Sequence, residues 1–251
     1  MAAAPDGLVM AELKNLVKEF DLRHTRSIKE YMVWWVTGRK GDLTESFKAL
    51  DDVSFTIRQG ESVALLGFNG SGKSTTLKMV SGVMLPDSGT VSVRGRIAGL
   101  IEVGAGMHPD LTGRENVFLN GAILGMTEEQ IRARFDSIVA FSGIEKFIDT
   151  EVKFYSSGMY MRLAFSVAVH SDPDLFLVDE VLAVGDEPFQ RKCIAKMREL
   201  RDSGQTLMVV SHDLELIKSI CERGIVLQNG RVIHDSGIVE AVDFLRSTMS
   251  D

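Results

Sequence analysis

A short glycine-rich segment limits the possible folds of this chain more than any other feature. The segment reads Gly67-Phe-Asn-Gly-Ser-Gly-Lys-Ser74 and directly follows the apolar run Val63–Leu66. A helical pattern of apolar residues comes next, at Leu77, Val80 and Val83. Glycines in this arrangement let the backbone wrap closely around phosphate groups, and the start of the helix adds positive potential. The order of strand, loop and helix therefore predicts a site for the phosphates of a nucleotide.

Two polar side chains at the end of this segment have specific predicted roles. Lys73 has the length to reach the β- and γ-phosphates, and the hydroxyl of Ser74 is suited to bind Mg²⁺. The backbone N–H groups of the segment are expected to surround the phosphates. The residues predicted to bind the nucleotide here are Gly67, Phe68, Asn69, Gly70, Ser71, Gly72, Lys73, Ser74 and Thr75.

Two further apolar runs, Leu175–Val178 and Leu207–Val210, also end in polar residues. Runs without polar alternation are typical of strands buried on both faces of a parallel sheet, and the carboxyl ends of such strands converge on ligands. Asp179 is therefore predicted to hold Mg²⁺, and Glu180 to orient and deprotonate the attacking water. His212, after the other run, is predicted to contact the γ-phosphate.

The composition restricts the class of protein. With 251 residues, 45% apolar and 25% charged, the chain can form one soluble globular domain, or one with a small appendage. A net charge of −7 argues against nucleic acid as a partner. Its two cysteines indicate reduced cytosolic thiols. Neither a signal peptide nor a run of about 18 apolar residues is present, so attachment to a membrane would need another chain.

Several local patterns predict further elements. Thr127–Gln130 and Thr112–Glu115 have the spacing of helix capping boxes. Asn229-Gly230, between short apolar stretches, predicts the tight turn of a hairpin, and a last helix is expected from about Ile238 to Leu245.

A basic, aromatic segment from Asp21 to Glu45 interrupts the first strand-like region. Residues 18–40 contain six Lys or Arg against three acids, and Tyr31–Val36 includes both tryptophans of the chain. Two interpretations stay open: an ordinary helix with a buried aromatic face, or an element that meets a membrane surface or a membrane partner.

A further motif indicates the family. Tyr155-Ser-Ser-Gly-Met159 opens a helix, so Ser156 and Gly158 would lie at a helix N-terminus, where anions bind. Together with the glycine-rich loop, Asp179-Glu180, Ala183-Val-Gly-Asp186 and His212, in this order, it resembles an ATP-binding cassette domain. The resemblance extends from about Leu8 to Leu245.

This resemblance implies an α/β fold of the P-loop NTPase class, with a mostly parallel sheet core, an antiparallel β subdomain and an α-helical signature subdomain. The implied domain covers residues 8–245, with an insertion at about 21–45 and the helical subdomain at about 105–170. ATP and Mg²⁺ are the implied ligands. A head-to-tail dimer is also implied, in which Ser156 and Gly158 of one copy cap the γ-phosphate held by the other.

Three segments resemble a subfamily, the ATPase subunits of bacterial exporters of O-antigen, teichoic acid, capsule or wall galactan. They are Gly104–Asn116, the Tyr-Ser-Ser-Gly-Met signature and Val178–Asp186. The resemblance implies hydrolysis of ATP at the cytoplasmic face of the membrane, through a permease that moves a lipid-linked polysaccharide. The permease is expected to meet about Gly104 to Asn120. Some relatives carry an extra carbohydrate-binding domain, and we expect none here.

The chain also departs from the usual cassette pattern. In the usual signature Leu-Ser-Gly-Gly-Gln, Ser157 replaces the first glycine and Met159 replaces the glutamine, changes that also occur in the polysaccharide subfamily. No glutamine occupies the loop that normally offers one to Mg²⁺, and Glu102 is the nearest candidate by spacing. Phe20 is the expected aromatic partner of adenine, with Tyr31 or Phe47 as alternatives.

Two other classes of protein can be compared with the exporter. A cassette protein of translation or DNA repair usually has two cassettes or long coiled coils, and this chain has one cassette and no sustained heptads. In a P-loop kinase, the signature and His212 would have no purpose. Co-purification with a polytopic membrane protein, or with ribosomes or DNA, would distinguish exporter from soluble ATPase.

Overall fold

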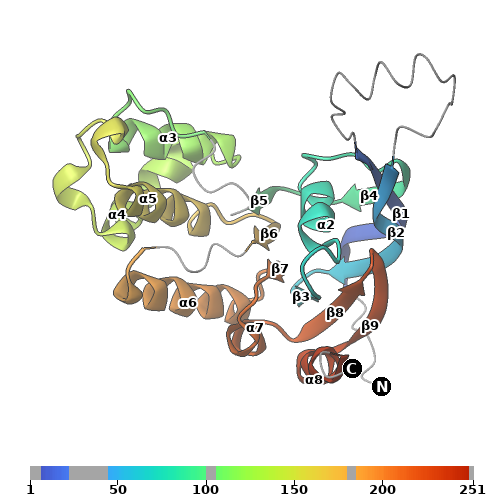
Figure 1. Cartoon of the computed structure of the whole chain (residues 1–251). Coiled ribbons are helices and arrows are strands. Elements are labelled where there is room, and N and C mark those ends of the chain that lie inside the picture. The colour runs from blue at the N-terminus through green and yellow to red at the C-terminus, as the bar shows by residue number, and fades with distance from the viewer. Residues whose placement is uncertain (1–6, 23–44, 100–105, 180–184, 249–251) are drawn as a thin grey trace, which may run out of the picture.

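The computed structural model describes residues 7–22, 45–99, 106–179 and 185–248 (Figure 1). One lobe contains two β-sheets, and a helical lobe lies to the side of them, at the left of Figure 1. Most of the segment 21–45, and with it Tyr31 and both tryptophans, lies outside the described residues. Glu102 and Glu180 lie outside them as well.

The larger sheet has six strands in the order β5-β6-β7-β3-β8-β9. Neighbours are parallel except for β9, which runs antiparallel to β8. All residues of β3, β6 and β7 are buried, because helices and the second sheet cover both faces. The mostly parallel core is thus confirmed. The strands are β3 (Ser62–Leu66), β5 (Ile97–Gly99), β6 (Leu175–Val178), β7 (Leu207–Val210), β8 (Arg223–Gln228) and β9 (Arg231–Gly237).

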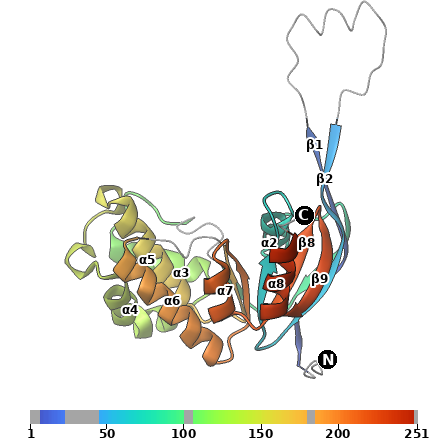
Figure 2. The ribbon, with the colours of Figure 1, turned by 60° about the horizontal axis from the view of Figure 1, so that its bottom comes forward.

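The smaller sheet is antiparallel and has the order β2-β1-β4, as the predicted antiparallel part requires. Its strands are β1 (Val9–Leu22), β2 (Glu45–Arg58) and β4 (Ser88–Val93). Figure 2 shows the distal ends of β1 and β2 projecting beyond the rest of the described fold.

Helices of two kinds surround the sheets. The helical lobe consists of α3 (Gly113–Ile123), α4 (Glu128–Ser142), the 3-10 turns η1 (Glu145–Phe147) and η2 (Val152–Phe154), and α5 (Ser157–Val169). It has an apolar core of its own, built around Val117, Ile138 and Leu163. Its extent agrees with the helical subdomain expected at about 105–170, although the domain bounds stay predictions. The other helices are α2 (Lys73–Val80), α6 (Glu187–Asp202), α7 (Leu214–Ile220) and α8 (Ile238–Thr248).

The helix ends test the local predictions. Thr112 and Thr127 each cap a helix through a complete capping box, as predicted. The last helix begins at Ile238 as expected and continues to Thr248. The prediction that Val83 belongs to the helix after the glycine-rich loop is wrong, because α2 ends at Val80 and the Val83 side chain is exposed.

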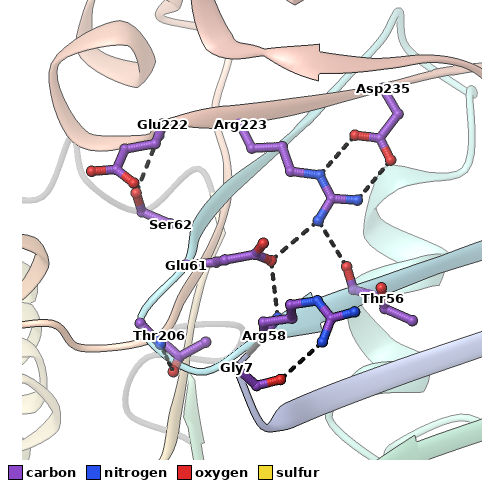
Figure 3. Close-up of polar contacts among 10 residues, drawn as sticks. Gly7, Thr56, Arg58, Glu61, Ser62, Thr206, Glu222, Arg223 and Asp235 are labelled. Atoms are coloured by element: carbon purple, nitrogen blue, oxygen red, sulfur yellow. Dashed lines mark hydrogen bonds and ion pairs between the residues drawn. The ribbon is translucent and has the colours of Figure 1, made fainter. Parts of the chain in front are cut away.

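A polar network joins the two sheets at the end opposite the glycine-rich loop (Figure 3). The Arg223 guanidinium donates two hydrogen bonds of 2.7 Å to the carboxylate of Asp235. It also donates to the Thr56 carbonyl at 2.9 Å and to Glu61 Oε2 at 3.1 Å, and Glu61 accepts from the Arg58 amide. Hydrogen bonding to Asp235 raises the pKa of Arg223. One partly buried cation therefore ties β2, β8 and β9 to the residue before β3.

Two smaller sequence observations can be compared with the structure. No helix in the described ranges is long and apolar enough to cross a bilayer. Cys193 and Cys221 are both buried free thiols, and burial raises the pKa of each to about 12.

Candidate functional site

The glycine-rich loop connects the carboxyl end of β3 to the start of α2, and the surrounding backbone permits only glycine at two positions. At Gly67, an added Cβ would lie 2.3 Å from the Leu227 carbonyl oxygen. Gly72, at φ +105°, is the residue before α2, and a Cβ there would lie 2.7 Å from the Ala49 carbonyl oxygen. Neighbouring strands β2 and β8 thus press against the loop and define its shape.

The turn of the last hairpin braces this loop. The Gly230 amide donates to the Ser71 carbonyl at 3.2 Å, and the Asp51 amide donates to the Gly230 carbonyl at 2.8 Å. Sequence reasoning identified the turn but not this contact, because the position of a hairpin relative to a distant loop leaves no local pattern.

The polar side chains of the loop are suited to a polyanion. The Lys73 side chain is nearly buried, and its ammonium donates to the carbonyls of Gly67 and Phe68 at 2.7 and 3.0 Å. Buried as well is the Ser71 hydroxyl, which finds no hydrogen-bond partner among the described residues. A buried donor without a partner is destabilising. Phosphate oxygens would accept hydrogen bonds from the Lys73 ammonium and the Ser71 hydroxyl, so the residues present fit a nucleoside triphosphate.

A pocket of about 210 Å³ extends from the glycine-rich loop to strands β1 and β2. Phe20 on β1 and Phe47 on β2 are directly paired across the antiparallel strands, so their side chains lie on the same face. Phe20 and Phe47 are 36% and 47% exposed, so both rings are accessible to a ligand. The pocket is lined by Phe20, Phe47, Ala49, Asn69, Gly70, Ser71, Gly72, Lys73, Ser74 and Thr75.

Sequence reasoning treated Phe20 as the expected aromatic and Phe47 as an alternative, and the structure brings the two together. Ala49, two residues further along β2, was not predicted. The pairing of β1 with β2 would have to be known to predict that Ala49 also lines the pocket.

A second pocket, of about 250 Å³, lies where β3 and β7 end. His212 lines this pocket together with Gly67, Phe68 and Asn69, so the ends of these two strands converge as expected. Asp213 fixes the start of α7 by accepting hydrogen bonds from the amides of Glu215 and Leu216. His212 is therefore held next to the first half of the glycine-rich loop.

The predicted metal ligands are only partly described. Asp179 directly follows β6, which pairs with β7, and β7 pairs with β3. Within the described ranges, no group of three His, Cys, Asp or Glu side chains could hold a metal ion by itself. Mg²⁺ bound by Ser74, Asp179 and Glu102 therefore stays a prediction, as does the role of Glu180.

Ser156 and Gly158 lie at the start of α5, in the helical lobe. Ser156 caps α5, its hydroxyl accepting from the Met159 amide at 3.2 Å, and Gly158 lies in the first turn. Neither residue lines a pocket described above. Both views show α5 in the helical lobe, well separated from α2 (Figures 1 and 2). A single chain does not bring these residues to its own glycine-rich loop.

Residues 50–183 match the model of the ABC transporter family. Export proteins from several bacteria are also similar. An O-antigen export system ATP-binding protein of Myxococcus xanthus is 44% identical over 91% of this chain and 53% of its own length. Another, of Klebsiella pneumoniae, is 39% identical over 94% of this chain and 97% of its length. A teichoic acids export ATP-binding protein of Bacillus anthracis is 43% identical over 78% of this chain and 35% of its own length.

The chain spans about half the length of the Myxococcus xanthus protein. Among solved structures, a dimeric ATP-binding cassette in a post-hydrolysis state with ADP and Pi superimposes with a TM-score of 0.70. It is 25% identical and covers 91% of this chain and 99% of its own.

Proposed function

Because this chain belongs to the ABC transporter family, we propose that it is the ATP-hydrolysing subunit of an exporter for a lipid-linked cell-surface polysaccharide. The similarity to O-antigen and teichoic acid export proteins supports this substrate class and disfavours a soluble role in translation or repair. The observation that carries the proposal is the glycine-rich loop, with its buried Lys73 side chain and with a buried Ser71 hydroxyl that has no hydrogen-bond partner in the described part of the chain.

ATP would lie along the first pocket. Its phosphates would accept hydrogen bonds from the loop amides, from Lys73 and from Ser71, and its base would stack on Phe20 and Phe47. The second pocket supports a role for His212 at the terminal phosphate, because it brings this side chain to the first half of the same loop.

Hydrolysis needs a base and a metal near the terminal phosphate. Ser74 and Asp179 would hold Mg²⁺, which would neutralise charge on the phosphates. Glu180 would accept a proton from the attacking water, and His212 would donate a hydrogen bond to the γ-phosphate. Asp179 and Glu180 come after β6 and His212 after β7 along the chain, whereas Ser74 is the second residue of α2.

A second copy of the chain would complete the site. The distance between α5 and the glycine-rich loop within one chain supports a head-to-tail arrangement, in which Ser156 and Gly158 contact the nucleotide of the other copy. The similarity to a dimeric cassette with ADP and Pi supports the same arrangement. ATP would favour the closed pair because the γ-phosphate touches both copies only there.

A membrane permease would be the second partner, with this chain bound peripherally at the cytoplasmic face. The contact surface would include the described part of the segment from Gly104 to Asn120. Asn116 is fully buried and stiffens it, donating to the carbonyls of His108, Leu111 and Thr112 at 3.0, 3.1 and 2.9 Å. A rigid segment is suited to transmit movement to a partner.

Reconstitution with the candidate permease in proteoliposomes tests this function. We expect ATP hydrolysis to rise when the permease and its lipid-linked glycan are present, and the glycan to cross the bilayer. Co-purification with ribosomes or DNA instead of a polytopic membrane protein would refute the exporter role.

A further inference from the structure

The strand that bears Phe20 loses a neighbour on one side shortly before that residue. β1 pairs with β2 along its whole length, but with β4 only as far as Val17, which faces Ser88. Beyond Val17, the described parts of β1 and β2 continue without β4, and Figure 2 shows their ends projecting from the fold. A two-stranded ribbon is only marginally stable by itself in water. The direction of the Phe20 side chain therefore depends on the contacts that hold the base of this ribbon.

Asp87 holds this point of β1 with both its backbone and its side chain. Its amide donates a hydrogen bond of 2.9 Å to the Val17 carbonyl. Its carboxylate accepts one of 2.7 Å from the Glu19 amide and one of 2.8 Å from Lys18 Nζ. These two donors lower the pKa of Asp87, so its carboxylate is charged at neutral pH. Three successive residues of β1 are thus tied to one residue, and the last of them directly precedes Phe20.

An irregularity in the strand pairing falls at the same place. Between Lys18 and Glu19 the register shifts, and Ala49 is an extra residue on β2. Such a bulge bends a strand and re-aims the side chains next to it. The Lys18 ammonium also lies 5.7 Å from the centre of the Phe20 ring, a distance suited to a cation–π interaction. Asp87 therefore fixes the ring in two ways, through the backbone of Glu19 and through the side chain of Lys18.

The loop that contains Asp87 starts from the helix that carries Lys73. This helix, α2, begins at Lys73, and the chain turns back just after its end, where the Met84 amide donates to the Lys78 carbonyl at 3.1 Å. Asp87 comes three residues after Met84 and directly precedes β4. A short connection with its own hydrogen bonds therefore runs from the phosphate-binding helix to the strand that bears Phe20.

We propose that Asp87 is a positioning residue for the nucleotide base, which holds the Phe20 ring in place relative to the glycine-rich loop. The inference rests on the proposed function, in which the base stacks on Phe20 while the phosphates bind the loop. Asp87 itself does not line the pocket that joins them. If the ribbon moves, the ring is in place in only a fraction of the molecules, and the apparent affinity for the nucleotide falls with that fraction.

Binding of ATP and of inorganic triphosphate to the purified full chain tests this role. Asp87→Ala removes both side-chain contacts and keeps the hydrogen bond from its amide to Val17. We expect ATP binding to weaken about fivefold, because the ring would be in place less often but would not be lost. Inorganic triphosphate, which has no base, should bind within about twofold of the wild type. Asp87→Asn keeps an acceptor for the Glu19 amide and should recover part of the lost affinity.

A double-mutant cycle separates positioning from general damage. In the Phe20→Ala background there is no ring to position, so adding Asp87→Ala should change the ATP affinity by less than about twofold. Asp174→Ala is the matched control. The Asp174 carboxylate also accepts from a backbone amide, that of Arg96 at 2.6 Å, but Asp174 lines neither of the pockets described above. This control should bind ATP as the wild type does.

Three results would overturn the positioning role. They are wild-type affinity for ATP in Asp87→Ala, an equal loss of affinity for ATP and inorganic triphosphate, and an undiminished effect of Asp87→Ala in the Phe20→Ala background. The same loss of ATP affinity in Asp174→Ala would also overturn it. A wild-type chain that binds no ATP would refute the proposed function itself, whereas a wild type that binds ATP, with an unaffected Asp87→Ala variant, would refute only this inference.

Discussion

Phe20 and Phe47 are direct cross-strand partners, and both rings border the pocket that reaches the glycine-rich loop. We expect Phe20→Ala and Phe47→Ala each to weaken ATP binding about tenfold, because stacking on an aromatic ring contributes about 1–3 kcal/mol per base. Inorganic triphosphate, which has no base, should bind both variants as it binds the wild type. Equilibrium titration with both ligands measures the two effects.

Phe147→Ala is the control for this prediction, since its side chain is 48% exposed, like that of Phe47, but lies in η1 of the helical lobe. Unchanged ATP affinity in Phe47→Ala would leave Phe20 as the single stacking residue. Unchanged affinity in both variants would mean that the base lies elsewhere.

Glu180→Gln should separate binding from chemistry. An amide cannot take a proton from water, so turnover should fall by about 10²-fold or more while ATP still binds. Single-turnover hydrolysis and ATP titration give the two quantities. Glu187→Gln changes an exposed carboxylate in the first turn of α6 and should leave the rate unaltered. If Glu180→Gln hydrolyses ATP at the wild-type rate, another group is the base.

Arg223→Met should destabilise the junction of the two sheets. The substitution removes a bidentate contact with Asp235 and leaves Glu61, whose side chain is 19% exposed, with a partly buried charge. We expect the free energy of unfolding to fall by about 2–3 kcal/mol, because hydrogen bonds to charged groups contribute about 1.5–3 kcal/mol. Urea denaturation measures the change.

Arg191→Met provides the comparison for that experiment. Its ion pair with Glu187 spans one turn of α6, with both side chains more than two-thirds exposed, so its loss should cost less than about 0.5 kcal/mol. Equal destabilisation by the two substitutions would contradict the role given to the network.

The two cysteines should respond to pH and to thiol reagents in a defined direction. Burial raises the pKa of Cys193 and of Cys221 from 9.0 to about 12. The folded state therefore keeps protons that the unfolded state loses, so stability is full below about pH 9 and declines as the pH rises toward 12. Ellman's reagent at about pH 8 should react slowly with the native protein and fast after unfolding. Rapid native reaction would show that these thiols are accessible.

The elements that sequence predicted well are those whose local pattern has one physical explanation. Val63–Leu66 and its two counterparts are uniformly apolar because each strand is buried on both faces. Thr112 and Thr127 form helix caps that the sequence predicts from a pattern of only four residues. The prediction for Val83 failed because the helical spacing of apolar residues continues in the sequence after α2 has ended. Gly82, at φ +78°, does not have a right-handed helical backbone conformation.

The relationships that sequence could not predict join distant residues. Phe20 meets Phe47 only in a register that several irregularities between β1 and β2 determine. Arg162 and Asp186, which form an ion pair, are 24 positions apart, and the turn at Gly230 contacts Ser71 in a loop that is distant along the chain. None of these pairs leaves a periodic signal, because tertiary packing decides which side chains meet.

Calorimetric titration of the chain with ATP and magnesium tests the central claim most directly. The account predicts saturable binding of about one nucleotide per chain, and at least about tenfold weaker binding to Lys73→Ala, whose charged contact with the phosphates is lost. No binding heat with ATP and magnesium at several temperatures, or equal affinity in Lys73→Ala, would contradict a phosphate site in the glycine-rich loop.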